Sequence, residues 1–237
     1  MKTKASEFFS KQDQKCISDI IKQAESNTSG EIAIMVLDAS DSYKEAETLG
    51  AFILSGFFAL ILEIIKSYYI ATKAVGWSYD PSGFSYQFLL EASGHTSIWT
   101  YIPMLFILYF PFKFIFSKID GIKIPFLSGK RIEETVRKRA LMAFYEKGLY
   151  KTRDETGILI FISLLEHRVW ILGDRGINAK IDPEFWGNIA AKLSEGIKKK
   201  EHGKATCDAI EECGKELSRY FLIKQDDTNE LSNEVMF

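Results

Sequence analysis

The amino-acid sequence predicts a small α/β domain, a three-layer sandwich around a short mixed sheet, that is interrupted by a two-helix transmembrane hairpin. The stretch from Thr156 to Gly173 (TGILIFISLLEHRVWILG) holds two apolar runs joined by a tight polar turn, which is typical of a buried β-hairpin. The run from Glu31 to Leu37 (EIAIMVL) is apolar and short between turn signals, which indicates another core strand. Two long apolar stretches between these strands predict the inserted hairpin.

The overall composition excludes some classes of function. The 237 residues carry 30 basic and 32 acidic side chains, a net charge of −2, which argues against a dedicated DNA- or RNA-binding protein. The spacing of Cys16, Cys207 and Cys213 matches no zinc or redox motif, so we expect reduced thiols in a cytoplasmic domain. The first residues, MKTKASEFFSKQDQK, lack an apolar segment, and no secretory signal is expected.

Residues 1–41 are predicted to form the first part of the cytoplasmic α/β domain. Ser10 followed by Asp13 resembles a capping box, and apolar residues at helical spacing then indicate a helix from about Lys11 to Ser26. The predicted strand Glu31 to Leu37 follows a polar turn. This part therefore contributes one helix and one core strand.

Residues 42–128 are predicted to form the inserted transmembrane hairpin, with spans at about 48–70 and 98–117. Each run provides the roughly 20 mainly apolar residues that a bilayer core requires. Tyr and Trp cluster at the ends of both runs, as they do at membrane interfaces. Two buried helices of a soluble protein are the alternative. Glu63 and Lys66 lie three residues apart on one helix face, where they can pair.

The basic residues around the two runs predict an orientation. The loop 71–97 holds only Lys73, whereas seven basic residues follow the second run: Lys118, Lys123, Lys130, Arg131, Arg137, Lys138 and Arg139. The positive-inside rule then places both termini in the cytoplasm, with the chain as a multi-pass protein of the inner membrane. The basic stretch either only sets this topology or also binds anionic lipid headgroups.

Residues 129–223 are predicted to form the second part of the domain. An amphipathic helix begins near Arg131 and ends near Gly148, and the β-hairpin follows. Asp182 before Pro183 marks the start of another helix, and a last helix covers about 204–222. Residues 224–237 are polar and acidic, so we expect a disordered tail.

Several of these segments resemble the TPM domain family. The resemblance rests on EIAIMVLD (Glu31 to Asp38), on TGILIFISLLEHRVWILGDRGI (Thr156 to Ile177) and on the helix from Asp182 with its Trp186. The run RKRALMAFYEKGLYKTRDETG (Arg137 to Gly157) is similar to a bacterial branch that carries a membrane hairpin inside the domain. The chain is thus similar to the membrane-inserted members of that family.

The resemblance covers roughly residues 8–41 and 129–223 and implies a three-layer α/β fold. Among relatives it implies several activities: acid phosphatase, binding of divalent cations such as calcium, and assembly or repair of membrane complexes. Soluble relatives often have a glycine-rich turn after the last strand. Here that place holds Gly173-Asp174-Arg175-Gly176, a departure that bears on any transferred binding site.

Three carboxylates form the candidate site that the sequence predicts. Asp154 precedes the second strand, Asp174 follows the third, and Asp182 starts the next helix. The outer ends of a hairpin are neighbours, and Ca²⁺ or Mg²⁺ requires several such oxygens, so we expect a metal site with Arg175 available to a phosphate. The alternative assigns Asp182 to a helix cap, Asp154 to a turn and Asp174 to a loop.

Two functions follow as hypotheses. The first is an accessory module that works in the assembly or maintenance of other membrane proteins, because the sequence shows an anchor and a domain but no convincing nucleophile. The second is a metal-assisted phosphatase that uses the acidic cluster. The expected partners are the lipid bilayer and other membrane proteins, with no nucleic acid. The oligomeric state stays open, and transport is disfavoured because two spans with one charge pair do not build a pathway.

Overall fold

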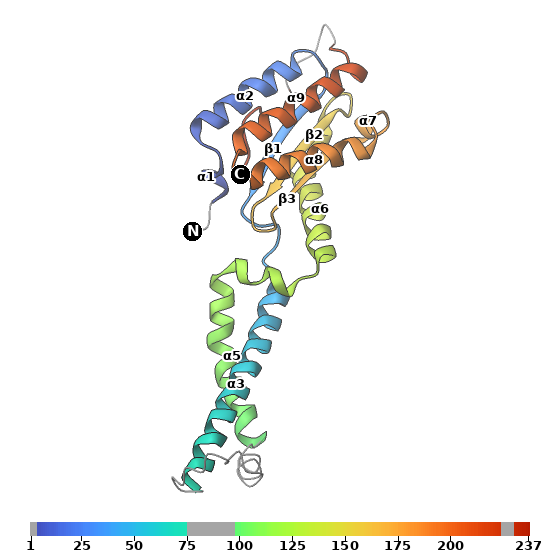
Figure 1. The fold of residues 1–237 in the computed structure, drawn as a ribbon. Helices are drawn as coiled ribbons and strands as arrows, with labels where there is room; N and C mark the ends of the chain where they lie inside the picture. The colour runs from blue at the N-terminus through green and yellow to red at the C-terminus, as the bar shows by residue number, and fades with distance from the viewer. Residues whose placement is uncertain (1–3, 75–97, 224–229) are drawn as a thin grey trace. The chain divides into compact units, whose positions relative to one another are not determined.

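The computed structural model describes residues 4–74, 98–223 and 230–237, and the chain forms two compact units within them (Figure 1). The first unit comprises Met1–Asp41 and Ser128–Phe237, and the second comprises Ser42–Leu127. The first unit is therefore assembled from segments on both sides of the second. Most of the loop that the sequence analysis expected outside the cytoplasm lies beyond the described residues.

A mixed sheet forms the centre of the first unit. In the described residues it has the order β1-β2-β3, with β1 at Glu31–Leu37, β2 at Gly157–Ser163 and β3 at Arg168–Gly173. The strands β1 and β2 are parallel, and their register runs from Glu31 opposite Gly157 to Leu37 opposite Ser163. The strands β2 and β3 are antiparallel. The predicted short mixed sheet is confirmed.

Helices cover both faces of this sheet. Their bounds are Ala5–Phe8 (α1), Lys11–Glu25 (α2), Gly129–Glu146 (α6), Arg175–Asn178 (α7), Pro183–Lys198 (α8) and His202–Tyr220 (α9). Helices α2, α8 and α9 lie together over one face (Figure 1). Helix α6 contacts β2 and β3. Short 3-10 turns lie at Asp120–Ile122, Ile124–Phe126 and Leu149–Lys151.

Side-chain alternation along the strands separates the two faces. The even-numbered residues of β1 and β2, such as Ile34 and Ile160, belong to one buried cluster with residues of α2, α8 and α9. The odd-numbered residues Met35 and Phe161 are buried as well, but outside that cluster, because successive side chains of a strand point to opposite faces. The predicted three-layer sandwich is thereby confirmed, with α6 on the second face.

Local sequence explains where the first long helix begins. The Ser10 hydroxyl accepts a hydrogen bond from the backbone N–H of Asp13 at 3.1 Å, and the Asp13 carboxylate accepts one from the Ser10 backbone N–H at 3.0 Å. These two bonds satisfy N–H groups that a helix start otherwise leaves unpaired. The predicted capping box is confirmed.

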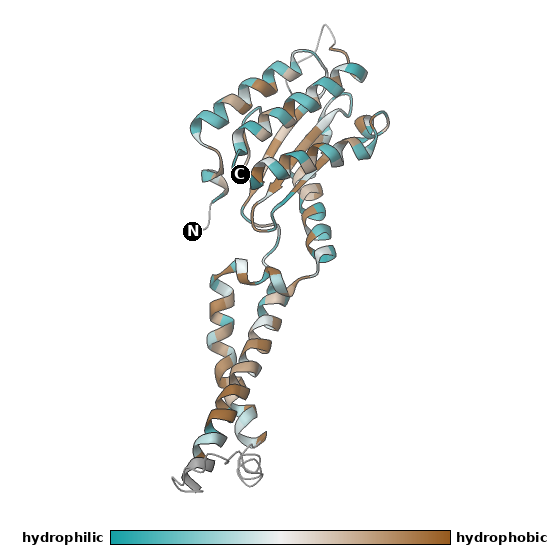
Figure 2. Cartoon of the chain, in the orientation of Figure 1, coloured by the Kyte–Doolittle hydropathy of each residue, from teal (hydrophilic) through white to brown (hydrophobic). Residues whose placement is uncertain are grey.

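The second unit contains two long apolar helices. Helix α3 spans Lys44–Ala74 and α5 spans Ile98–Lys118. They pack closely at Gly50, where an added Cβ would lie 2.3 Å from a ring carbon of Phe116. Figure 2 shows that hydrophobic residues dominate both helices. In length and composition the segments Lys44–Ile70 and Ile98–Lys118 suffice to cross a membrane.

A disordered tail was expected over residues 224–237, of which residues 224–229 lie outside the described part of the chain and residues 230–237 differ from that expectation. Residues 230–237 lie against β1, where Met236 and Met35 form a parallel bridge. The backbone N–H of Met236 donates to the Ile34 carbonyl at 2.9 Å, and the N–H of Val36 donates to the Met236 carbonyl at 3.0 Å. Polarity predicted disorder here, but backbone pairing with an open sheet edge does not depend on side-chain hydrophobicity.

Candidate functional site

The structure brings the segments of Asp154 and Asp174 together at one end of the sheet. The backbone N–H of Asp174 donates to the Gly157 carbonyl at 2.9 Å. A Cβ added at Gly176 would lie 2.8 Å from the carbonyl oxygen of Asp154 and 2.7 Å from that of Glu155. Any larger residue at position 176 would collide with this backbone, so the two loops meet closely.

The carboxylates themselves mostly act as helix caps. One oxygen of Asp174 accepts from the backbone N–H of Arg175 at 2.7 Å, at the start of α7. Asp182 accepts from the backbone N–H of Glu184 at 2.8 Å, at the start of α8. The other oxygen of Asp174, Oδ2, is buried and has no hydrogen-bond partner among the described residues. Such an orphaned acceptor is costly and marks this carboxylate as unusual.

A metal cage is not assembled in the described part of the chain. Across residues 4–74, 98–223 and 230–237, no group of three or more His, Cys, Asp or Glu side chains is placed to hold a metal ion. Arg175, which we expected to be available to a phosphate, lies with its Nε 3.6 Å from Glu155 Oε2 and is largely exposed. The donor set for Ca²⁺ or Mg²⁺ would therefore need ligands beyond the protein, such as water.

A buried polar cluster lies at the opposite end of the sheet, where the parallel strands end. The Ser163 hydroxyl donates to Glu166 Oε2 at 2.5 Å, and the hydroxyls of Ser40 and Ser163 are 2.7 Å apart. The backbone N–H of Ser40 donates to Glu166 Oε1 at 2.9 Å. Ser163 and Glu166 are 1% and 6% exposed, which is deep burial for a carboxylate.

The turn between β2 and β3 builds this cluster. The backbone N–H groups of Leu164 and Leu165 donate to the carbonyls of Leu37 and Asp38, both at 2.9 Å, so the turn folds across the end of β1. His167 adopts a positive φ of 51° within this turn. The carboxyl ends of parallel strands are where α/β proteins usually place functional groups.

Chemically, this cluster fixes the loop after β1 and does not have the arrangement that activates a serine nucleophile. A serine nucleophile needs a base that is itself oriented by a third group, and the imidazole nearest in sequence, that of His167, is exposed. The hydroxyls of Ser40 and Ser163 and the carboxylate of Glu166 bond to one another. Arg131 adds an ion pair to Asp41, with Nη2 3.1 Å from Oδ2. The residues after β1 are therefore held firmly where the chain enters the second unit.

Sequence reasoning missed the cluster of Ser40, Ser163 and Glu166, because its contacts join segments far apart in the sequence. In the sequence, Ser163 lies in the first apolar run of the predicted hairpin and Glu166 in its polar turn, and neither position indicates the contact by itself. Their contact with Ser40 depends on the register of β1 against β2, which is a long-range property. The usable signal was the position of polar residues just after two strands predicted to be parallel.

A second carboxyl pair lies beside the outer edge of β1. Burial, with a smaller contribution from the negative charge of Glu31, raises the pKa of Glu25 to about 7, although a hydrogen bond from the Ile32 backbone N–H opposes the shift. That N–H donates to Glu25 Oε1 at 2.9 Å. The amide of Asn233 donates to Glu25 Oε2. Glu25 therefore holds a proton in the folded state at pH values where the unfolded chain has lost it.

The three free cysteines lie on α2 and α9, and two of them, Cys207 and Cys213, are buried. The sulfurs of Cys16 and Cys207 lie 3.3 Å apart between α2 and α9. Burial raises the pKa of the Cys207 thiol to about 12, and it raises that of Cys213 to about 12 as well. Since the thiolate is the reactive form, Cys207 and Cys213 are poor nucleophiles at neutral pH.

We expect Glu25 to make the stability of the protein depend on pH. Because the folded state binds the proton more tightly, the free energy of unfolding falls as pH rises from about 4.5 to about 7. The variant Glu25→Gln lacks this proton. The free energy of unfolding of the wild type should therefore fall by roughly 1–2 kcal/mol more than that of the variant between pH 5 and pH 8, an amount discounted for partial exposure.

Urea unfolding in detergent at both pH values measures this difference, since subtraction of the variant removes the contribution of the titrating groups that do not interact with Glu25. Asp19→Asn, an exposed change on the same helix, serves as the control and should track the wild type. Parallel pH profiles for the wild type and Glu25→Gln would contradict the assignment.

Comparisons with known proteins agree with this architecture. Residues 119–216 match the TPM domain family. The NMR structure of BA42 protein from the psychrophilic bacterium Bizionia argentinensis is similar in fold, with a TM-score of 0.55 and 20% sequence identity, over 98% of this chain and 97% of that chain. No curated protein matches the sequence. The resemblance to the TPM domain family is thus confirmed for residues 119–216, and the likeness to BA42 protein shows a shared fold.

Proposed function

We propose that this protein is a membrane-anchored accessory module, which uses its TPM domain in the assembly or maintenance of other membrane proteins. In this proposal α3 and α5 cross the inner membrane and both termini are cytoplasmic. The observation that carries it is the exposed apolar surface of these two helices. The orientation rests on the basic residues that follow the second helix.

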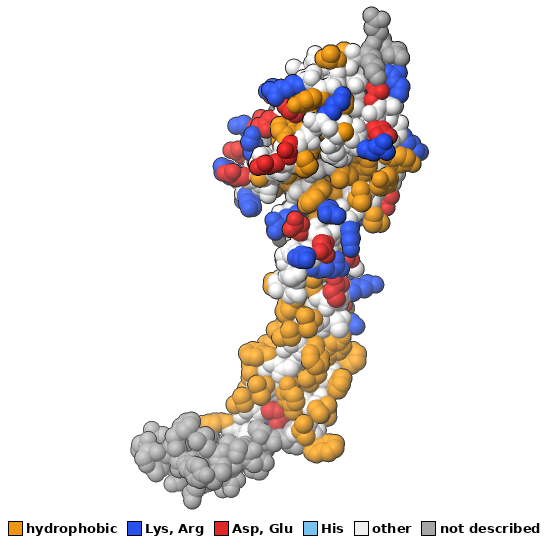
Figure 3. All heavy atoms as spheres, turned by 90° about the vertical axis from the view of Figure 1, so that its right-hand side faces the viewer, with side chains coloured by type: hydrophobic (Ala, Val, Ile, Leu, Met, Phe, Trp, Pro, Cys, Tyr) orange, Lys and Arg blue, Asp and Glu red, His pale blue; other side chains and the backbone are white. Residues whose placement is uncertain are grey.

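The exposure of the apolar side chains supports a bilayer location. In the most apolar stretch of each helix, 28% of α3 and 0% of α5 is buried, whereas the core helix of a soluble protein would be mostly buried. Figure 3 shows hydrophobic side chains gathered along this unit. Contiguous apolar surface of this extent requires a lipid or protein partner.

The charged pair within the hairpin fits the same location. Glu63 is 3% exposed, and its Oε2 lies 2.5 Å from Lys66 Nζ. Lys66 Nζ also donates to the hydroxyl of Thr100 on α5 at 2.7 Å. The pair therefore ties α3 to α5 and turns Glu63 inward, as ionisable groups in membranes do.

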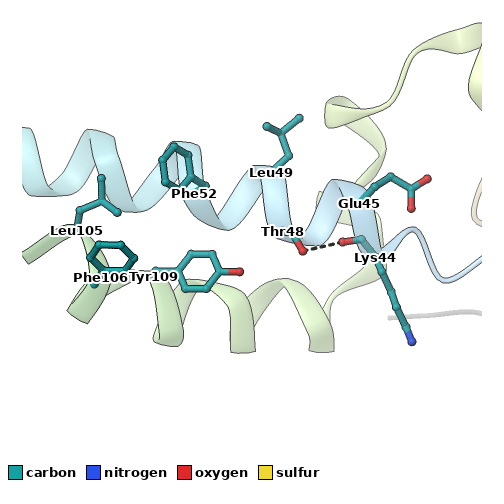
Figure 4. A pocket seen from close by; sticks show the side chains of 8 residues that line it. All are labelled: Lys44, Glu45, Thr48, Leu49, Phe52, Leu105, Phe106 and Tyr109. Carbon is teal, nitrogen blue, oxygen red and sulfur yellow. Dashed lines mark hydrogen bonds between the residues drawn. The ribbon is translucent and has the colours of Figure 1, made fainter. Parts of the chain in front are cut away.

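An apolar groove between α3 and α5 supports contact with another membrane component. It has a volume of about 660 Å³. Its lining is drawn in Figure 4 and consists of Lys44, Glu45, Thr48, Leu49, Phe52, Leu105, Phe106 and Tyr109. Aromatic and leucine side chains dominate its wall, and the polar residues lie at the beginning of α3. Such a groove accepts an apolar helix of a neighbouring protein.

Photo-crosslinking in intact membranes tests this proposal. A benzoyl-phenylalanine placed at Phe52 or Phe106 faces the groove and should give discrete protein adducts. The same probe at Phe57 or Phe114, exposed aromatic positions outside the groove, should give mainly lipid adducts. Lipid adducts at all four positions would reduce the hairpin to an anchor and would contradict a role that depends on membrane-protein contact.

The competing function is a metal-assisted phosphatase that uses Asp154, Asp174 and Asp182 with Ca²⁺ or Mg²⁺. The observation in its favour is the buried Asp174 Oδ2, which has no hydrogen-bond partner among the described residues, next to the loop of Asp154. A hard cation would supply the missing partner and, in a phosphatase, would polarise a phosphoryl oxygen.

Thermal unfolding with added Ca²⁺ or Mg²⁺ tests this competing function. Binding to the folded state alone should raise the melting temperature, and Asp174→Asn should abolish the increase. The control Asp208→Asn changes an exposed carboxylate of α9 and should keep it. An increase of equal size in all three proteins, or none in the wild type, would exclude this site.

A further inference from the structure

The outer edge of β1 is the feature from which a further inference follows. β1 pairs with β2 through its odd-numbered residues: the N–H of Glu31 donates to the Thr156 carbonyl, and the carbonyl of Leu37 accepts from Leu164. In an extended strand the backbone groups of the alternate residues then point the other way. Ile32, Ile34 and Val36 therefore present their backbone groups along the outer edge.

The segment 230–237 occupies part of this edge. Its Met236 makes both edge hydrogen bonds, to the carbonyl of Ile34 and from the N–H of Val36, as an added parallel strand does. Of the two other outward N–H groups, that of Ile32 donates to the Glu25 side chain. The added pairing therefore rests on one residue, whereas β1 and β2 pair over seven.

Side chains of residues 230–237 also contact the surface beside the outer edge of β1. Asn233 is 8% exposed and donates its amide hydrogen to Glu25. Val235, two residues later, packs against the main hydrophobic core, whereas Glu234 between them is exposed. The backbone N–H of Glu230 donates to Glu31 Oε1 at 3.2 Å. The pattern is an amide, an exposed residue and an apolar residue, followed by the residue that pairs with the edge.

We propose that the outer edge of β1 is a binding site for an extended peptide with this pattern, and that residues 230–237 occupy it in the free protein. The ligand runs parallel to β1, adds one strand to the sheet, and places an amide side chain against Glu25 two residues before an apolar one. Strand addition of this kind draws affinity from backbone pairing and selectivity from alternate side chains. A partner segment with the same pattern displaces residues 230–237.

A peptide-binding experiment tests this site directly. The chain is prepared in detergent without residues 230–237, and a fluorescent peptide with the sequence of those residues, ELSNEVMF, is added. We expect saturable binding to the shortened chain and binding at least about tenfold weaker to the full chain, in which the same segment competes. Equal binding to both chains, or no binding to a shortened chain that still unfolds cooperatively, would overturn the proposal.

Peptide variants distinguish strand addition from non-specific binding. Met236→Pro removes the N–H that donates to Ile34, and Asn233→Ala removes the amide that contacts Glu25, so each should weaken binding at least about tenfold. Phe237→Pro is the matched control, because Phe237 is exposed and follows the pairing residue. Equal binding of the Met236→Pro and Phe237→Pro peptides would contradict pairing with the edge.

A second variant tests the proposal if the chain without residues 230–237 does not fold. If the shortened chain fails to fold, the full chain with Met236→Pro serves instead, because it loses the N–H that donates to Ile34 and so one of the two edge hydrogen bonds of the segment. This chain should bind the wild-type peptide at least about tenfold more tightly than the unaltered chain does. If its affinity equals that of the unaltered chain, the proposal is wrong.

Discussion

The parallel pairing of β1 with β2 is the interaction on which the rest of this structure depends. It joins Glu31–Leu37 to Gly157–Ser163 over seven residue pairs, although the whole second unit lies between them in the sequence. The entropic cost of closing such a long loop grows only slowly with its length, so a long insertion is tolerated. Both strands are buried on their two faces, and that burial stabilises the pairing.

The same pairing creates the groups that the protein can use. Register brings Ser40 beside Ser163 and lets Glu166 hold the chain just after β1. The ion pair between Asp41 and Arg131 places the two ends of the interrupted domain next to each other. At its other side, β1 remains an edge that accepts residues 230–237. A domain built in this way can hold a long inserted unit between β1 and α6.

Sequence patterns revealed the elements better than the contacts between them. The apolar runs at Glu31–Leu37 and Thr156–Gly173 became the predicted strands, and the capping box at Ser10 formed as expected. These features are local. The cluster of Ser40, Ser163 and Glu166 escaped prediction because it depends on register. The docking of residues 230–237 was not predicted, because backbone pairing leaves little trace in composition.

The loops of Asp154 and Asp174 do meet, but helix capping uses carboxylate oxygens that a metal would need.

The central claim is that the α/β domain closes on itself through β1 and β2, and that the inserted helices α3 and α5 are not part of its core. The most direct measurement replaces residues 42–127 with a glycine–serine linker of about eight residues, which spans the short gap implied by the ion pair of Asp41 and Arg131. Unfolding by urea is then followed without detergent. The account predicts a soluble protein with a single cooperative transition. A protein that aggregates or lacks such a transition would show that the hairpin is part of the fold.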